Sequence, residues 1–238
     1  EGHRWGCFDY SQQEPRLVVH YALATLGTTG VQSIADKYDE ARKNPDDPDI
    51  QLAADFHSMV AEIADIERGQ AKTINLGLFY GMGKAKLQAQ LGVTDQVARN
   101  LLATYHSKVP FVKQLIHHTM DRAQQRGWIR TILGRKCRFN MWEPATFGMH
   151  KPQTFEDASM EHGSRNIKRA FTYKALNKLI QGSAADMTKQ AMINLREAGI
   201  TPMIQIHDEL NVSYENEQGA DKIKEIMEQA VPLKVPNK

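Results

Sequence analysis

The stretch RGQAKTINLGLFYG, residues 68–81, is the part of the sequence that is most informative about fold and function. Four of its residues, Arg68, Lys72, Leu76 and Tyr80, recur at steps of four. Residues four apart lie nearly above one another on a helix, so two cations, an apolar side chain and an aromatic ring share one face. Cations can bind phosphates and the ring can meet another ring. The pattern predicts a helix with a nucleotide-binding surface.

Length and composition are those of a globular protein with a substantial core. The chain has 238 residues, of which 24% are charged and 41% apolar. The formal net charge is only +2, so binding of a polyanion would need local basic patches. Two such patches, each with an ordinary solvated face as the alternative, are Arg126, Arg130, Arg135, Lys136 and Arg138, and Arg165, Lys168, Arg169 and Lys174.

Cys7 and Cys137 are the only cysteines, and their spacing predicts neither a zinc site nor a disulfide framework. This favours a reducing, cytoplasmic setting. No apolar run reaches the length needed to span a bilayer, so no membrane partner is expected. The first residue is Glu1 rather than Met, which indicates a fragment or a processed product.

The chain predicts strands near both ends with helices between them. One strand is expected over 5–10, a hairpin turning at Leu133–Gly134 over 128–139, and two strands around His207–Asp208 over 203–214. Helices are expected over 13–26, 55–66, 68–81, 94–105, 109–125, 167–198 (interrupted at Gly182) and 218–230. Residues 43–49 and 140–164 are expected to be loops. This organisation predicts an α+β fold with a small antiparallel sheet.

Two carboxylates stand out because each borders an apolar strand. Asp9 ends the first strand, and Asp208 lies at the tip of the last hairpin. A carboxylate beside apolar residues is costly to bury, and a metal ion is a strong compensation. Two carboxylates on adjacent strands can hold two magnesium ions for an in-line phosphoryl displacement. The alternatives are a helix N-terminal acid for Asp9 and an ordinary turn residue for Asp208.

Together these segments resemble a known family. DYSQQEPR at 9–16, R-x3-K-x3-L-G-x2-Y-G at 68–81 and HDE at 207–209 resemble motifs A, B and C of family A DNA polymerases. That family includes bacterial DNA polymerase I and many phage replicases. QGSAAD at 181–186 and LGRKCRF at 133–139 resemble further signatures, and the QQEPR variant is closer to phage-type members.

The resemblance implies a right-hand architecture, with an antiparallel palm sheet and a helical fingers subdomain. The palm is expected over residues 1–30 and 166–238, incomplete at its C-terminal end, and the fingers over 31–165. A thumb is absent from the expected architecture. The thumb and an exonuclease-like part are expected in a separate chain or a removed segment.

The resemblance also assigns the catalytic roles. Asp9, Asp208 and the main-chain carbonyl of Tyr10 are expected to bind two Mg²⁺ ions, with Mn²⁺ able to substitute. Glu209 is expected to assist them. Lys72 is a candidate proton donor to pyrophosphate.

Further residues are expected to contact the nucleotide and the DNA. Glu14 would block a ribose 2′-hydroxyl, Tyr80 would stack near the templating base, and Leu76 stands where the family usually has Phe or Tyr. Plain structural roles are the alternatives: a helix-surface histidine for His57 and a core aromatic for Tyr80. The implied nucleotide-binding set is Tyr10, Gln12, Gln13, Glu14, His57, Arg68, Lys72, Leu76 and Tyr80. The implied DNA-binding set is Asn177, Gln181 and His207.

The resulting expectation is template-directed DNA synthesis from dNTPs on a primer-template. A single-subunit RNA polymerase is one alternative, because it shares a similar K-x7-Y-G helix. An inactive nucleic-acid-binding fragment is another. A metal-dependent nuclease could use the two aspartates but would not need the Arg68 helix.

Overall fold

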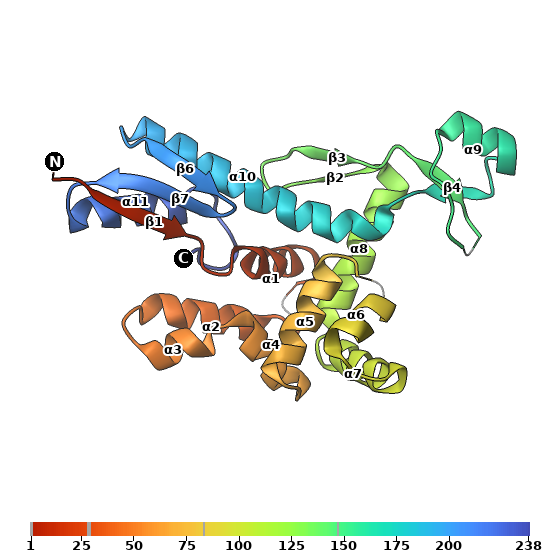
Figure 1. Ribbon diagram of the computed structural model, residues 1–238, viewed down its shortest axis with the longest axis horizontal. Coiled ribbons are helices and arrows are strands. Elements are labelled where there is room, and N and C mark those ends of the chain that lie inside the picture. The colour runs from red at the N-terminus through yellow and green to blue at the C-terminus, as the bar shows by residue number, and fades with distance from the viewer. Residues whose placement is uncertain (1, 28–29, 83, 147) are drawn as a thin grey trace.

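The computed structural model describes residues 2–27, 30–82, 84–146 and 148–238. Its main sheet has three antiparallel strands in the order β1–β7–β6 (Figure 1). These strands are β1 (Arg4–Asp9), β6 (Pro202–Ile206) and β7 (Glu209–Tyr214). The first strand of the chain therefore pairs with one of the last, which confirms the predicted sheet built from both ends.

The register of β1 and β7 gives the sheet two different faces. Phe8 pairs with Leu210, and this face carries the fully buried Leu210 and Val212. Asp9 pairs with Glu209 on the opposite face, because successive side chains of a strand alternate. Burial of the apolar face leaves the carboxylates on the open face.

Two helices pack near the sheet, and a third connects it to the rest of the chain. The helices α10 (Ala175–Glu197) and α11 (Glu217–Glu228) pack against each other, and α10 also contacts β6 and β7. The helix α1 (Gln13–Leu26) contacts both α10 and α8 (Pro110–Arg126). In Figure 1, α1 lies between the sheet-containing half and the remaining helices.

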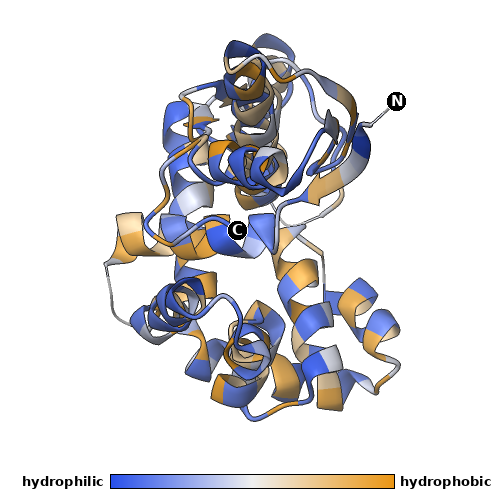
Figure 2. Cartoon of the chain, turned by 90° about the vertical axis from the view of Figure 1, so that its left-hand side faces the viewer, coloured by the Kyte–Doolittle hydropathy of each residue, from blue (hydrophilic) through white to orange (hydrophobic). Residues whose placement is uncertain are grey.

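Six further helices form the other half of the molecule. Figure 2 shows apolar and polar residues interspersed along the helices, and each of the six except α3 contributes buried side chains to one continuous core. These helices are α2 (Gln32–Lys43), α3 (Pro48–Ala53), α4 (Phe56–Ala64), α5 (Arg68–Phe79), α6 (Lys84–Leu91) and α7 (Asp95–Lys108).

The prediction that residues 140–164 form a loop is wrong. This segment contains β4 (Trp142–Pro144) and α9 (Phe155–His162), and β4 pairs with β5 (Ile167–Arg169). A strand of three residues is too short to show a period in the sequence. Its pairing partner β5 also lies beyond α9, so no local turn signal indicates the pair. The start of α9 had a local signal, since Thr154 caps it by accepting a hydrogen bond from the Asp157 amide.

The prediction of a helix over 167–198 interrupted at Gly182 is also wrong. The first residues form β5 and a short 3-10 turn, η1 (Thr172–Lys174), and α10 then runs unbroken through Gly182. A Cβ at Gly182 would lie 2.7 Å from Thr131 Cγ2. The glycine therefore permits close packing of the 128–139 hairpin on α10 rather than a break in the helix.

Other predicted elements agree more closely with the structure. The 13–26 helix is confirmed, as is the hairpin, whose strands are β2 (Trp128–Arg130) and β3 (Lys136–Arg138). Residues 43–49 are not entirely loop, because α3 begins at Pro48, and the sequence analysis missed α2 and α6. The subdomain boundaries at residues 30 and 165 stay a prediction. None of the helices in the described ranges has both the length and the apolar character required to cross a membrane.

Candidate functional site

The predicted catalytic carboxylates gather at one end of the sheet. Asp9 ends β1, Glu209 begins β7 opposite it, and Asp208 occupies the connecting turn of the adjacent hairpin. Burial raises the pKa of Asp9, and the negative charges of Asp208 and Glu209 raise it further, against an opposing effect of His207. The structure thus brings the predicted carboxylates close enough to repel one another.

The turn that carries Asp208 is tight. His207 has a left-handed backbone, with φ of 57°, which a side chain other than glycine rarely adopts. Its ring Nδ1 lies 2.9 Å from Asp208 Oδ1. The hairpin therefore presents His207 and Asp208 together at the edge of the open face.

Asn211 supports this cluster from beneath and was missed by the sequence analysis. Its amide Nδ2 donates to Glu209 Oε1 at 2.6 Å, and its Oδ1 accepts from Trp5 Nε1 at 3.0 Å. The same oxygen accepts from the Cys7 thiol at 2.9 Å. Asn211 is buried, so these bonds orient Glu209 from the side of the sheet. A lone Asn in a strand gives no sequence signal for this role.

The turn between β1 and α1 is held by its side chains. Tyr10 donates from its hydroxyl to the Met227 carbonyl at 2.7 Å and is buried. Arg16 is also buried and donates from Nε to the Ser11 carbonyl at 2.8 Å. Both anchors fix the main chain immediately after Asp9.

Gln12 is part of the same turn and has a left-handed backbone, with φ of 56°. Its Oε1 accepts from the Phe56 amide at 2.7 Å and the Tyr38 hydroxyl at 3.2 Å, and its Nε2 donates to the Ala54 carbonyl. These contacts join the turn to the start of α4. Both polar atoms of the Gln12 side chain thus make contacts within the protein, and the expected contact of Gln12 with a nucleotide stays a prediction.

The four residues that recur at steps of four lie along one helix and its C-terminal cap, as their spacing predicted. Arg68, Lys72 and Leu76 belong to α5, and Tyr80 caps its C-terminal end. Arg68 Nε donates to Asp55 Oδ1 at 3.0 Å, while Lys72 is exposed and has no carboxylate partner within the described residues. The cations are therefore present on one face, but Arg68 is already held by its Nε.

His57 lies beside these two cations with its ring oriented by buried groups. Its Nδ1 is 3.1 Å from Asn75 Nδ2, and Asn75 Oδ1 accepts from the Tyr105 hydroxyl. Burial lowers the pKa of His57, and the charges of Arg68 and Lys72 lower it further against Asp55. With the amide donating to Nδ1, the ring is neutral and carries its proton on Nε2. The sequence analysis missed both Asn75 and Tyr105.

Glu14 and Tyr80 bring the first turn of α1 and the end of α5 together. The Tyr80 hydroxyl donates to Glu14 Oε2 at 2.9 Å. Burial raises the pKa of Tyr80 to about 12, with Glu14 adding to the effect and Gln181 opposing it. A cavity of about 280 Å³ beside them is lined by four of the predicted residues, Gln13, Glu14, Gln181 and His207, and by Ala184, Ala185 and Thr188.

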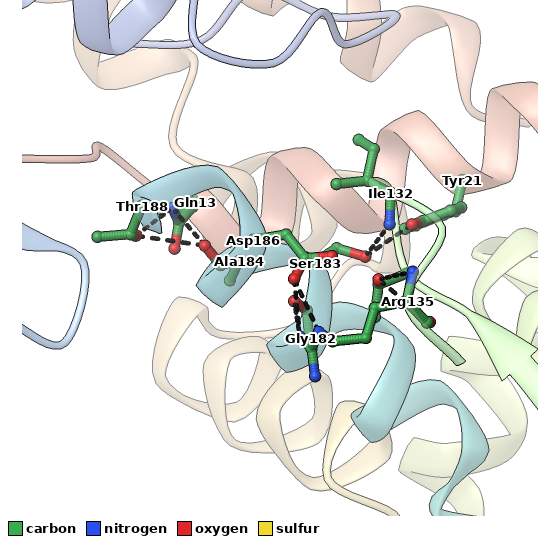
Figure 3. A network of polar contacts seen from close by, with 10 residues as sticks. Gln13, Tyr21, Ile132, Arg135, Gly182, Ser183, Ala184, Asp186 and Thr188 are labelled. Carbon is green, nitrogen blue, oxygen red and sulfur yellow. Dashed lines mark hydrogen bonds and ion pairs between the residues drawn. The ribbon is translucent and has the colours of Figure 1, made fainter. Parts of the chain in front are cut away.

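The QGSAAD segment forms a polar network between α10, α1 and the hairpin (Figure 3). Gln13 is buried and donates from Nε2 to the Ala184 carbonyl and to Thr188 Oγ1, each at 3.3 Å. Ser183 Oγ accepts from the Ile132 amide at 3.0 Å and lies 2.7 Å from the Tyr21 hydroxyl. These bonds hold α10 against α1 and the 128–139 hairpin.

An ion pair completes this network. Arg135 reaches Asp186 Oδ1 from Nε at 3.0 Å and from Nη2 at 2.8 Å, and Nη2 also donates to the Gly182 carbonyl (Figure 3). Asn177 and Gln181 share one face of the same helix, although only Gln181 lines the 280 Å³ cavity. The segment therefore positions Gln181, which is the one member predicted to contact DNA.

A small antiparallel sheet that ends in carboxylates, joined through the Glu14–Tyr80 contact to a helix with a cationic face, is the arrangement expected of a polymerase domain. The model of the family DNA polymerase family A matches residues 1–238 of this chain. The chain belongs to this family. It is similar in structure to the POL domain of Pol1 from M. smegmatis in complex with DNA primer-template and dNTP, with a TM-score of 0.71 and 27% identity. That similarity covers 100% of this chain and 39% of the other.

Sequence relatives come from phages and bacteria. The chain is 34% identical to a DNA-directed DNA polymerase of Pseudomonas phage M6, over 100% of this chain and 37% of the relative. It is 32% identical to DNA polymerase I of Geobacillus stearothermophilus, over 97% of this chain and 24% of the relative. The chain thus spans between about a quarter and two-fifths of the proteins that it resembles.

Proposed function

We propose that this chain performs the nucleotidyl-transfer step of DNA-directed DNA synthesis, joining a dNTP to a primer 3′-hydroxyl during DNA replication. The observation that carries the proposal is the convergence of Asp9 and Asp208 at the end of the sheet. The Glu14–Tyr80 contact brings the nucleotide-binding helix beside the cavity that His207 lines. Relatives named as DNA polymerases support the same activity.

The donor set fits divalent cations with oxygen ligands. After burial, the negative charge of Asp208 contributes to the raised pKa of Asp9, and a cation between the two carboxylates would relieve that repulsion. Within the described ranges no three His, Cys, Asp or Glu side chains form a ready-made cluster, so the pair would need other oxygens. We propose that the Tyr10 carbonyl supplies one, since its turn is held by the buried Tyr10 side chain. Two Mg²⁺ ions, or Mn²⁺, would activate the attacking oxygen and stabilise the leaving one.

The cationic face of α5 would bind the triphosphate. Only Nε of Arg68 is used by Asp55 and Ser58, so its terminal nitrogens can donate to phosphate oxygens. Lys72 is exposed on the same face, and His57 offers its Nε2 proton nearby. Lys72 is also the group that we propose to protonate the pyrophosphate. Preorganised positive charge of this kind stabilises developing negative charge in the transition state.

The sugar and the base pair would lie in the cavity beside Glu14. Glu14 and Tyr80 would close the space next to the sugar 2′ carbon, and Leu76 lies one helical turn before Tyr80. Gln181 would reach the minor-groove acceptors common to all base pairs, with Asn177 one turn away on α10. His207 would contact the primer end. We propose that the rest of the natural polypeptide, or a separate chain, supplies the thumb that grips duplex DNA.

The proposal is tested by primer extension with the natural polypeptide, which is the full-length protein that contains this chain. The expected result is magnesium-dependent addition of dNTPs to a primer-template, lost in Asp208→Asn and retained in the matched surface variant Asp221→Asn. Preference for dNTPs over NTPs would exclude an RNA polymerase. Absence of metal-dependent extension in the natural polypeptide, with primer-template binding intact, would leave only a nucleic-acid-binding module and would overturn the proposal.

A further inference from the structure

The 128–139 hairpin has a basic outward face that the proposed polymerase site does not use. Trp128 pairs with Arg138 and Arg130 pairs with Lys136, so these four side chains share one face of the hairpin. Arg126 adjoins them from the end of α8. The Trp128 ring lies 4.9 Å from Lys136 Nζ, 5.2 Å from Arg130 Cζ and 5.8 Å from Arg126 Cζ. We call these five residues the hairpin patch.

The cations of the hairpin patch lack acidic partners. None of Arg126, Arg130, Lys136 and Arg138 forms an ion pair with a carboxylate in the described part of the chain. Arg135, on the same hairpin, is paired with Asp186 and therefore belongs to the structural network. Four exposed cations around one aromatic ring leave a strong local positive field although the whole chain is nearly neutral.

The hairpin patch continues into a cavity of about 340 Å³ between α1, α8, β2 and α10. Arg126, Trp128 and Arg130 line it together with Arg122 and His118, and its lining contains no Asp or Glu. His118 Nε2 is shielded from solvent and has no hydrogen-bond partner among the described groups. The arginines therefore set the charge of the cavity.

The cavity lies on the other side of α10 from the proposed DNA contacts. Leu179 lines the cavity, whereas Gln181 lines the cavity beside Glu14. Two residues along a helix correspond to about 200° of rotation, so these side chains point to nearly opposite sides. The two cavities share no lining residue.

We propose that the hairpin patch and its cavity bind the phosphate backbone of a single strand of nucleic acid. A row of arginines provides bidentate donors for successive phosphates, and Arg122, which lines the cavity with Arg126 and Arg130, would hold one phosphate inside it. The cavity has the size of a site for one small ligand group and cannot admit a duplex. The patch outside it extends the contact along the strand. This site is independent of the proposed catalysis.

Binding of fluorescein-labelled dT12 tests this proposal, measured by anisotropy over a series of salt concentrations. The natural polypeptide is first saturated with a primer-template that has a short 5′ template overhang, which occupies the proposed polymerase site. The double variant Arg126→Gln/Arg130→Gln is compared with the control double variant Lys43→Gln/Lys222→Gln. The control removes two exposed cations that lie far from the hairpin patch in the sequence. Circular dichroism checks that each variant is folded. If Arg126→Gln/Arg130→Gln does not fold, Lys136→Gln/Arg138→Gln takes its place.

Loss of two phosphate contacts should reduce the slope of log K against log salt by about 1.4 and weaken binding by about twentyfold at ~0.1 M salt. The control pair should bind as the unmodified protein does. Tripolyphosphate should compete with dT12 if phosphates are what the site binds. Equal loss of affinity in both double variants, or complete displacement of dT12 by the primer-template, would overturn the proposal. Competition by poly-glutamate as strong as that by tripolyphosphate would also overturn it, in favour of an acidic protein partner.

Discussion

The Tyr80 hydroxyl donates a 2.9 Å hydrogen bond to Glu14 Oε2, although the two residues are 66 positions apart. Glu14 lies in the first turn of α1, directly after the sheet, and Tyr80 ends α5. Burial raises the pKa of Glu14, while the bond from Tyr80 and the charge of His207 oppose that rise. Glu14 therefore forms part of the wall of the 280 Å³ cavity at a point where the two halves of the molecule meet.

Removal of this wall should relax the choice of sugar. Glu14→Ala is expected to lower discrimination between a dNTP and the matching NTP by about 10- to 200-fold, because space opens beside the 2′ carbon. Single-turnover incorporation of both nucleotides on one primer-template measures the ratio. Glu14→Gln retains the bulk and an acceptor for Tyr80, so it should change the ratio much less. An unchanged ratio in Glu14→Ala would contradict the role assigned to Glu14.

Leu76 should control the response to dideoxynucleotides. Leu76→Tyr is expected to increase ddNTP incorporation relative to dNTP by about 10- to 100-fold, because the new hydroxyl can bond to the nucleotide where the missing 3′-hydroxyl would have acted. Competition between ddNTP and dNTP in primer extension measures the change. Leu76→Phe adds the ring without the hydroxyl and is the matched control. Equal incorporation ratios for Leu76→Tyr and the unmodified enzyme would exclude this explanation.

The parts of the fold that sequence patterns predicted are those with local signals. The helix 13–26 and the hairpin around Leu133–Gly134 have a continuous period or a turn signal, and both agree with the structure. The pairing of β4 with β5 was missed because α9 separates the strands. Gly182 was interpreted as a helix break because glycine lowers helix propensity, whereas its actual role depends on the approach of Thr131.

The candidate site shows the same division. Asp9, Arg68 and Asp208 could be predicted as site residues because each belongs to a short motif, and that assignment stays a prediction. The groups that orient the neighbouring Glu209 and His57 could not, since Asn211 is held by Trp5 and Cys7 from another strand and Asn75 by Tyr105 from another helix. Such partners are chosen by tertiary contact, and a single Asn in a strand or helix has no distinguishing pattern. The Asp55–Arg68 pair also became visible only in the fold.

Asp55 should stabilise the fold in a pH-dependent way. It caps α4 by accepting from the Ser58 amide, and Asp55→Ala is expected to lower the free energy of unfolding by about 1–2 kcal/mol at neutral pH. Burial alone would raise the pKa of Asp55, but hydrogen bonds from Arg68 and Ser58 outweigh it, so the pKa lies below the ordinary 3.8. A depressed folded-state pKa gives stability that is present above pH 3.8 and lost as the pH falls through the folded value.

Urea unfolding of the unmodified chain and Asp55→Ala, at neutral pH and at pH values below 3.8, measures this difference. The gap between the two proteins should narrow as the pH falls. Asp46→Ala removes an acid from a nearby turn, where it makes no capping bond among the described residues, and should shift stability by less than about 0.5 kcal/mol. A gap that stays constant over the pH range would show that the charge of Asp55 contributes nothing.

Gly182 should be intolerant of even one added methyl group, for a reason that a second substitution can test. The new Cβ of Gly182→Ala would lie 2.7 Å from Thr131 Cγ2, a contact that forces the hairpin away from α10. The expected loss of unfolding free energy is about 1–3 kcal/mol, despite the better helix propensity of alanine. Thr131→Ser removes the clashing methyl and retains the hydroxyl that accepts from the Arg135 amide. The double variant should therefore recover most of the stability, measured by thermal and urea unfolding. If Thr131→Ser gives no recovery, the cost of Gly182→Ala does not come from the approach of the hairpin to α10.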